Sequence, residues 1–163
     1  MAVDMFLKLT DITGESRDDK HKDEIELLAF SWGMSQSGTT HSGGGGGAGK
    51  VNVQDISCTK YVDKSTPTLM QKCFTGKHIA KGTLIVRKAG GTPLEYIKLE
   101  MEEIIVSSVS SGGSGGEDRL TENVSLNFAK FSYTYTPQKA DGTADTSIPV
   151  GWDIAASKEA AAG

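Results

Sequence analysis

The first segment whose residue types suggest chemistry is a glycine-rich run that ends in lysine. Gly44, Gly49 and Lys50 fit GxxxxGK, the pattern with which backbone amides and a lysine hold a nucleotide phosphate. Such a loop also needs Ser or Thr after the lysine and a helix whose N-terminus faces the anion. Val51 stands there instead, at the start of an expected strand, and the match lies within five consecutive glycines. We therefore do not predict a nucleotide cofactor.

A second pattern, GxSxG, is centred on Ser114 in residues 112–116. A nucleophile elbow requires a sharp turn from a strand into a helix, whereas a charged segment and another strand follow here. An enzyme that uses Ser114 or Cys58 as its nucleophile is a weak alternative, because no base can be placed beside either residue. We predict a flexible hairpin loop at 112–116 and no catalytic residue.

Metal-ligating residue types are present but scattered. His21, His41 and His78 lie in polar segments without metal-ligand spacing, so we expect surface histidines and no metal site. Cys58 and Cys73 are the only cysteines, and the sequence favours two reduced thiols over a disulfide. The chain therefore gives no reason to predict a cofactor.

Charge and length exclude other classes of protein. The chain has 163 residues, enough for one domain, and 17 basic against 21 acidic side chains give a net charge of −4. No basic stripe indicates nucleic-acid binding, and the mixed charges of residues 15–24 predict a solvated loop. Asp4 and Lys8 interrupt any leader-like run, and the uncharged run 27–49 is half glycine and hydroxyl residues. We expect cytoplasmic folding, no membrane insertion, and export by a route without a cleaved signal peptide.

Apolar residues that alternate with polar ones predict that most of the chain is β-strand. The scarcity of helical pattern disfavours a parallel βαβ sheet, and the longest strands must bend or project from the body. The apolar side changes between Phe128 and Ala129, and again near Gln54–Asp55, which indicates bulges or passage between sheets. The first expected strand contains Met5, Leu7 and Leu9, and the others lie at about 24–36, 51–62, 83–87, 94–110, 120–135 and 150–154.

One short helix is expected at residues 66–75. Ser65-Thr66-Pro67 supplies a capping hydroxyl and a proline suited to the first turn, and Gly76 suits the C-terminal end. Its apolar residues recur at helical spacing: Leu69, Met70, Cys73 and Phe74. The predicted fold is mainly β, a two-sheet antiparallel barrel or sandwich with one flanking helix. We expect a single domain at 1–155 and a disordered or frayed tail at 156–163.

The strand at 24–36 has an unusual pattern. We expect its even positions to form an apolar face, at Leu28, Phe30, Trp32 and Met34. The opposite face holds Ala29, Ser31 and Gly33, although solvated strand faces usually carry charged or β-branched residues. A small, uncharged face suits close packing against another subunit or the lining of a shared opening.

Long blocks of the chain resemble one family in order. The segments MAVDMFLKL, FSWGMSQSG, GAGKVNVQDIS-CTKYVDKSTPTLM and SSVSSGGSGGEDRLTENVSLNFAK resemble the haemolysin-coregulated protein (Hcp) family of type VI secretion. The likeness runs from residue 1 to about 155, so it is far more specific than either glycine motif.

The resemblance implies a structural role rather than an enzyme. Hcp proteins form hexameric rings of two-sheet barrels, and the rings stack into a tube that a contractile sheath expels behind a spike. The lumen carries and protects effector proteins, and fold and use are similar to those of phage tail-tube proteins. The expected partners are therefore copies of the chain itself, together with the sheath, the spike and effector proteins.

The resemblance also suggests positions for two functional surfaces. It places Ser31 on the lumen-facing strand, which would explain the small face at Ala29, Ser31 and Gly33. It places the glycine-rich loop where the family reaches toward the neighbouring ring, at Gly43, Gly44, Gly45, Gly46, Gly47, Ala48, Gly49 and Lys50. Two alternatives stay open: a phage tail-tube-like subunit, and a monomeric β-sandwich that binds a small molecule or carbohydrate.

Overall fold

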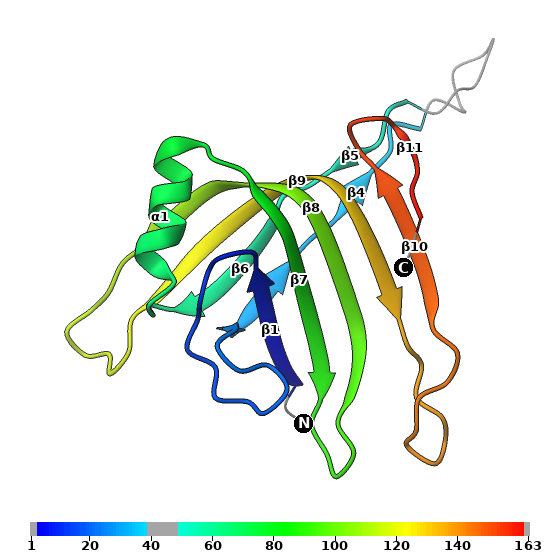
Figure 1. The fold of residues 1–163 in the computed structure, drawn as a ribbon, viewed down its shortest axis with the longest axis horizontal. Helices are drawn as coiled ribbons and strands as arrows, with labels where there is room; N and C mark the ends of the chain where they lie inside the picture. The colour runs from blue at the N-terminus through cyan, green and yellow to red at the C-terminus, as the bar shows by residue number, and fades with distance from the viewer. Residues whose placement is uncertain (1–2, 39–48, 162–163) are drawn as a thin grey trace.

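The computed structural model describes residues 3–38 and 49–161, which form a β-barrel flanked by one helix (Figure 1). All the strand pairs of this barrel are antiparallel, so the mainly β fold with one short helix is confirmed. The elements are β1 (Val3–Leu9), β2 (Ile25–Leu27), β3 (Ala29–Ser31), β4 (Met34–Ser35), β5 (Asn52–Val53), β6 (Ile56–Tyr61), α1 (Thr66–Thr75), β7 (Ile79–Lys88), β8 (Leu94–Ser111), β9 (Thr121–Tyr135), β10 (Ile148–Asp153) and β11 (Lys158–Glu159).

The barrel closes because one stretch of chain pairs with two different strands. β2 pairs with β1, and after Leu28 the chain continues as β3, which pairs with β6. The amide of Leu28 donates to the carbonyl of Thr59 at 2.8 Å, so pairing continues across the junction. From β6 the order runs through β9, β8 and β7 back to β1. Closure satisfies the backbone groups that an open sheet edge would leave exposed.

The two longest strands bend at the same level. β9 pairs with β6 as far as Leu126 and with β10 from Lys130 onward, always keeping β8 on its other side. The buried side changes between Phe128 and Phe131, as the sequence predicts. In β8 the change coincides with Glu103, whose φ of 52° lies in the left-handed region. The bend carries both strands from the part of the sheet where β9 pairs with β6 to the part where β8 pairs with β7 and β9 pairs with β10.

The structure corrects the sequence prediction of a single strand at 24–36. It is divided into β2, β3 and β4, and the even-numbered apolar face does not form as expected. Phe30 and Trp32 pack against the core, but Leu28 is 43% exposed and Met34 is 52% exposed. The side chains face inward at odd positions in β2 and at even positions in β3, because the chain changes its pairing partner at Leu28. The break near Gln54–Asp55, between β5 and β6, occurs where the sequence predicts it.

Helix α1 has the predicted bounds and ends at Gly76, whose φ is 66° and whose amide donates to the carbonyl of Lys72. Two details differ from the prediction. The Ser65 hydroxyl does not cap the helix but donates to Asp63. Of the expected apolar residues, Leu69 is buried while Phe74 is 83% exposed. Because α1 lies across one end of the barrel, it buries only a narrow row of its side chains.

Three further findings concern loops and the tail. The loop 15–24 is not simply solvated, because His21 is buried against the barrel, which also corrects the expectation of a surface histidine. His78 is exposed, and His41 lies outside the described residues. Where the sequence predicts an unstructured tail, β11 pairs with β10. In the described parts of the chain, no helix has both the length and the apolar character needed to cross a bilayer.

The core fills the barrel with aliphatic side chains from every wall. At Gly82, on β7, an added Cβ would lie 2.7 Å from methyl groups of both Leu9 and Ile104. The strand therefore approaches its neighbours closely at this point. The buried apolar residues include Leu7, Leu9, Ile25, Leu27, Ile56, Leu84, Val86, Leu99, Met101, Ile104, Val106, Val124, Leu126 and Phe128.

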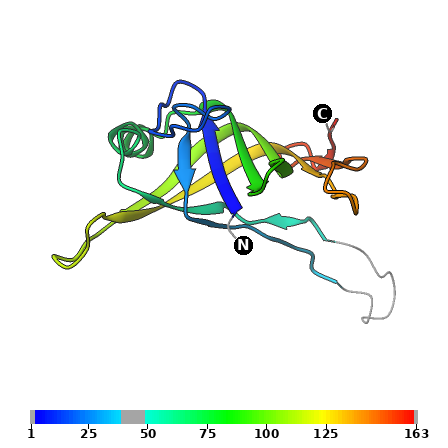
Figure 2. The same ribbon diagram turned by 90° about the horizontal axis from the view of Figure 1, so that it is seen from below.

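The molecule is elongated, and its ends differ. Figures 1 and 2 show α1 and the loop between β8 and β9 at one end, and the β4–β5 ribbon with β10 and β11 at the other. The ribbon is a separate two-stranded sheet in which Met34 pairs with Val53. Residues 39–48, which join its two sides, are not described.

Candidate assembly surfaces

The described residues that first suggested chemistry lack the structural context that this chemistry would require. Gly49 and Lys50 lie in a loop followed by β5 rather than by a helix, so the structural context of a phosphate loop is missing at these residues. Ser114 lies in the hairpin loop between β8 and β9, where its hydroxyl accepts from the amide of Gly116 at 3.4 Å. Cys58 is fully buried, and burial raises its pKa to about 12. A thiol in that state is not a nucleophile at neutral pH.

The small residues of β3 form part of an outward-facing surface. Ala29 and Ser31 are exposed, while Phe30 between them packs on the core. Gly33 is half-buried, and the side chain of Gln54 lies 3.2 Å from where its Cβ would be. The face that the sequence singled out therefore exists at Ala29 and Ser31 and is partly covered at Gly33.

This surface continues across three further strands. Ser31 lies opposite Ser57 on β6, which in turn lies opposite Ser125 on β9 and Ser108 on β8. Directly paired residues share a face of a sheet, so a second row runs beside the first through Ala29, Thr59, Asn123 and Ser110. The apolar Ile105, which lies opposite Asn127, borders this surface. We call the polar part of the surface the hydroxyl–amide face: Ala29, Ser31, Ser57, Thr59, Ser108, Ser110, Asn123, Ser125 and Asn127.

The hydroxyl–amide face is neutral between two charged ends. At one end the guanidinium of Arg119 lies 3.8 Å from the ring centre of Tyr61. At the other, Asp55 accepts from Ser107 at 2.6 Å and from Asn127 at 2.9 Å. Between them Thr59 donates to the side-chain carbonyl of Asn123 at 2.7 Å. The face therefore offers hydrogen-bonding groups with little electrostatic preference for a partner of either sign.

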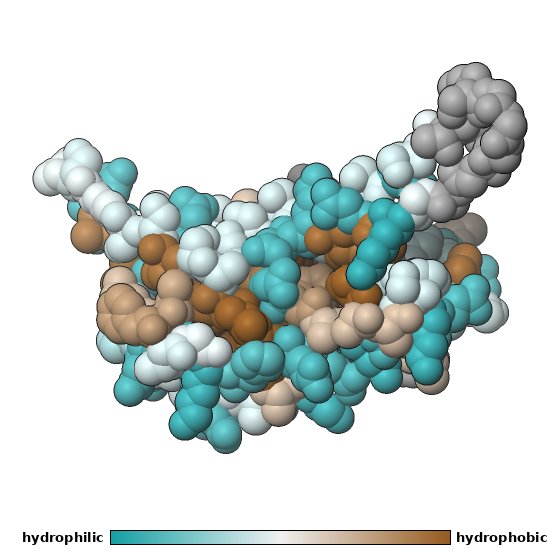
Figure 3. Space-filling view, turned by 90° about the horizontal axis from the view of Figure 1, so that it is seen from above, coloured by the Kyte–Doolittle hydropathy of each residue, from teal (hydrophilic) through white to brown (hydrophobic). Residues whose placement is uncertain are grey.

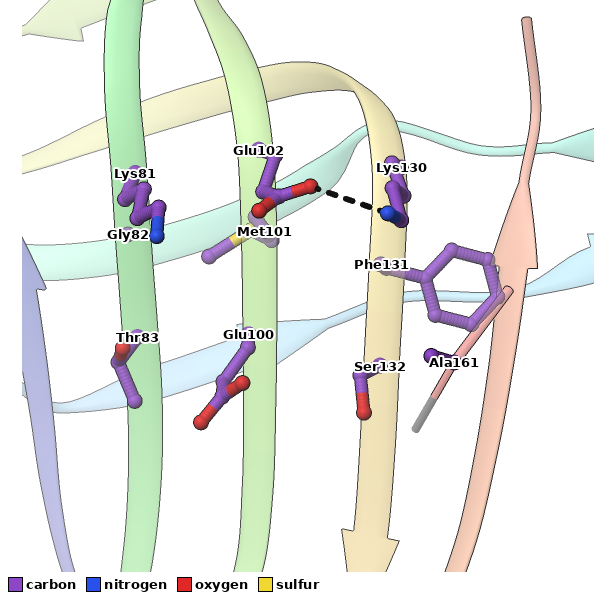
Figure 4. A pocket seen from close by; sticks show the side chains of 10 residues that line it. All are labelled: Lys81, Gly82, Thr83, Glu100, Met101, Glu102, Lys130, Phe131, Ser132 and Ala161. Atoms are coloured by element: carbon purple, nitrogen blue, oxygen red, sulfur yellow. Dashed lines mark ion pairs between the residues drawn. The ribbon is translucent and has the colours of Figure 1, made fainter. Parts of the chain in front are cut away.

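Beyond the bend in β8 and β9, where β8 pairs with β7, the outward surface is charged. Lys81, Glu102 and Lys130 lie side by side on β7, β8 and β9, and Lys130 pairs with Glu102 at 3.5 Å (Figure 4). They line a hollow of about 350 Å³ with Thr83 and Glu100. Such alternating charges are typical of a solvated exterior. The bend thus divides the outward side chains of β8 and β9 into a charged group on one side of it and an uncharged group on the other.

Apolar side chains are exposed at both ends of the molecule. In β10, Ile148 is 61% and Val150 is 58% exposed, on the same face as Tyr135 and Tyr133 of β9. This face continues the barrel interior beyond the point where the barrel closes. At the other end, Phe74 projects from α1. Figure 3 shows apolar residues in separate areas among hydrophilic ones on the face it presents, so apolar surface does reach solvent.

Most of the hydroxyl–amide face escaped the sequence prediction, although its signal is present. Thr121, Asn123, Ser125 and Asn127 alternate with the buried residues of β9, in the pattern TxNxSxN. Within each strand alone, the outward residues look like an ordinary solvent-exposed polar face. The lack of charge becomes a surface property only when the register brings β3, β6, β8 and β9 together. The predicted loop residues Gly43, Gly44, Gly45, Gly46, Gly47 and Ala48 lie outside the described residues.

Comparisons with known proteins agree with this architecture. Residues 6–135 match the model of the family described as type VI secretion system effector, Hcp. Protein hcp1 of Pseudomonas aeruginosa is 60% identical over 156 residues, which cover 94% of this chain and 96% of that protein. The structure described as that of a type six secretion system protein has a TM-score of 0.92 at 31% identity, with 98% of this chain and all of that chain covered. Hcp1 from Salmonella typhimurium has a TM-score of 0.81 at 40% identity, with the same coverage.

The fold and the comparisons together define a protein of type VI secretion. The chain belongs to the Hcp family, as its resemblance indicates.

Proposed function

We propose that this chain is the structural subunit of a type VI secretion tube rather than an enzyme. In this proposal it forms hexameric rings that stack, are expelled from the cytoplasm by the contractile sheath, and carry effector proteins in the lumen. The observation that carries the proposal is the hydroxyl–amide face, which we assign to the lumen. The alternative of a monomeric binding module leaves a neutral face of this extent without a role.

The chemistry of the hydroxyl–amide face suits a channel that must hold a protein and then release it. Hydroxyl and amide groups exchange hydrogen bonds between water and a protein surface at a small net free energy per contact. A charged wall would instead retain cargo of opposite charge and repel cargo of like charge. A neutral wall over four strands supports loose retention of varied effectors. Ser31 lies at the end of the row that includes Ser57, Ser125 and Ser108, so it is the natural position for a test.

The exposed apolar residues support the formation of a ring. A head-to-tail ring needs two different contact surfaces on each subunit. Ile148 and Val150 lie at one end of the elongated molecule, and Phe74 and Leu120 at the other. Large exposed apolar groups at two ends are expected where copies of a chain meet.

Stacking of the rings is assigned to the glycine-rich loop. The β4–β5 ribbon projects from the barrel (Figure 2), and the family resemblance assigns the contact with a neighbouring ring to the loop that joins its two strands. Ordering a glycine-rich segment costs more conformational entropy than ordering other segments. A stacking contact through this loop has to offset that cost, and we expect a deletion of residues 43–47 to leave single rings intact while blocking stacking and secretion.

The test of the lumen assignment compares two matched substitutions, Ser31→Gln and Thr83→Gln. Both replace a hydroxyl residue within a strand, but Thr83 lies on the charged surface of Figure 4. Each variant is co-expressed with the effectors of its own system, and effector retained per ring is measured by affinity capture and native mass spectrometry. We expect rings from both variants and a loss of retained effector only for Ser31→Gln, because the longer side chain at Ser31 would fill space that the effector occupies, although its amide keeps the surface neutral.

Two results would contradict the proposal. If Ser31→Gln rings retain as much effector as unmodified rings, the hydroxyl–amide face does not line the effector-holding space. If the full-length protein reaches the culture medium equally well from cells without the contractile sheath, the tube role is wrong.

A further inference from the structure

The loop of residues 15–24 forms a compact strap on the outside of the barrel. Its two ends are joined by backbone hydrogen bonds from Gly14 to Asp23 at 2.7 Å, from Ser16 to Glu24 at 3.0 Å and from Asp23 to Ser16 at 2.9 Å. Beneath it lies Phe6 of β1, which is only 3% exposed. The strap is therefore what shields this aromatic ring from water on the outer side of the barrel.

His21 fixes the strap at one point by three contacts. Its ring stacks on Phe6, with 4.4 Å between ring centres and an angle of 15° between planes. Its Nδ1 lies 2.9 Å from a carboxylate oxygen of Glu24, and its Nε2 lies 2.6 Å from one of Glu95 on β8. Both ring nitrogens thus face carboxylate oxygens, which only accept hydrogen bonds when ionised.

This arrangement needs one proton more than a neutral imidazole carries. A neutral ring donates from one nitrogen and presents a lone pair at the other. The second contact would then place a lone pair against a carboxylate at hydrogen-bond distance. Whether the extra proton resides on the ring or on a carboxyl group, both contacts are satisfied only while it is present.

A second anchor of the strap is insensitive to pH near neutrality. Arg87 of β7 donates to both carboxylate oxygens of Asp18 and, at 3.0 Å, to Asp4 of β1. The bond from Arg87 lowers the pKa of Asp18 to about 2, and Asp18 in turn raises the pKa of Arg87. The Arg87 guanidinium also lies 5.1 Å from the centre of the Phe6 ring. The titratable and charged groups around His21 are thus Glu24, Glu95, Asp18, Asp4 and Arg87, and the Arg87–Asp18 pair stays charged near neutral pH.

We propose that the strap 15–24 is a proton-dependent latch, closed over Phe6 when the His21–Glu24–Glu95 cluster holds its extra proton and loosened at its His21 end when that proton is lost. Stability from a histidine that gains acceptors is present at low pH and is lost as the pH rises. The Arg87 anchor keeps the other end attached, so the result is local opening rather than unfolding. The inference concerns a single subunit and does not depend on the tube proposal.

Amide hydrogen exchange tests the latch within one molecule. The amides of Asp23 and Glu24 report on the His21 end, and that of Lys20, which donates to Asp18 at 3.0 Å, reports on the Arg87 end. Protection factors, which correct for the intrinsic effect of pH on exchange, are compared at pH 5.5 and 9. We expect the protection of Asp23 and Glu24 to fall roughly tenfold or more, the effect of losing one charge-assisted hydrogen bond. Protection at Lys20 and in the core strands should stay constant.

A pair of matched variants separates the latch from general effects of charge. Glu95→Gln removes the carboxylate opposite Nε2, while Glu100→Gln removes a similarly exposed carboxylate of the same strand that pairs with Lys98. Glu95→Gln should abolish the pH dependence at Asp23 and Glu24, and Glu100→Gln should leave it unchanged. A pH-independent strap, or one whose pH dependence survives Glu95→Gln, would overturn the proposal.

Discussion

The buried ion pair between Lys60 and Glu122 gives the sharpest prediction about stability. These residues lie directly opposite each other on β6 and β9, and their side chains are 1% and 0% exposed. Lys60 also contacts Asp63 at 3.1 Å, and Thr66 at the start of α1 donates to Glu122 at 2.6 Å. The cluster therefore joins the helix to two strands in a place where water cannot replace a missing partner.

We predict that Glu122→Gln destabilises the folded chain by about 3 kcal/mol. Breaking a buried pair by removing one partner costs roughly 3–5 kcal/mol, because the remaining charge is left uncompensated. The lower value applies because Asp63 still faces the Lys60 ammonium. For a domain of this size the change corresponds to a fall in Tm of about 6–12 °C. The double variant Lys60→Met/Glu122→Leu should be more stable than Glu122→Gln, because no uncompensated ammonium remains and the Asp63 carboxylate keeps its hydrogen bonds from Ser65.

Urea unfolding followed by circular dichroism measures both variants. Assembly contributes to apparent stability, so all proteins are compared at one concentration with their oligomeric state checked by sedimentation. If Glu122→Gln changes the unfolding free energy by less than about 1 kcal/mol, the buried Lys60–Glu122 pair does not stabilise the fold as we predict. If the double variant is as unstable as Glu122→Gln, the uncompensated charge of Lys60 is not the cause of the destabilisation.

Three further predictions concern acid, thiols and the helix. The hydrogen bond from Arg87 lowers the pKa of Asp18 from 3.8 to about 2, so its stabilising effect is complete above about pH 4 and is lost toward pH 2. Urea midpoints of Asp18→Asn and the unmodified chain should therefore differ at pH 6 and converge near pH 2, and a constant difference would contradict this. Iodoacetamide should modify half-buried Cys73 but reach Cys58 only after unfolding. Peptide mass mapping identifies the modified thiol, and rapid labelling of Cys58 in the folded protein would show that it is not buried. Leu69→Ala should cost about 3 kcal/mol in urea unfolding, since this buried side chain attaches α1, and an unchanged midpoint would show that the helix is held by other contacts.

The sequence predicts those features that local periodicity controls. The alternation in β7 to β10, the bend after Phe128 and the helix that ends at Gly76 all appear where the pattern places them. Ser31 could be selected because a small, uncharged strand face is unusual within a single strand. The assignment of Ala29 and Ser31 to the lumen comes from the family resemblance and stays a prediction.

The features that escaped prediction depend on pairing between distant segments. Lys60 and Glu122 look like ordinary polar residues of two strands, and only the register of β6 against β9 shows that they neutralise each other in the core. His21 likewise sits in a charged run that suggests a solvated loop. It is buried because its ring stacks on Phe6 of β1, and it also contacts Glu95, which lies 74 residues away in the sequence.

The central claim is that copies of this chain form a ring whose opening is lined by the hydroxyl–amide face. Electron microscopy of the purified protein at near-atomic resolution tests this most directly. We expect a particle of about six times the 17.2 kDa chain mass, with Ser31, Ser57 and Ser125 facing a central channel. A monomer at high micromolar concentration, or a ring with these residues on its outer surface, would contradict it.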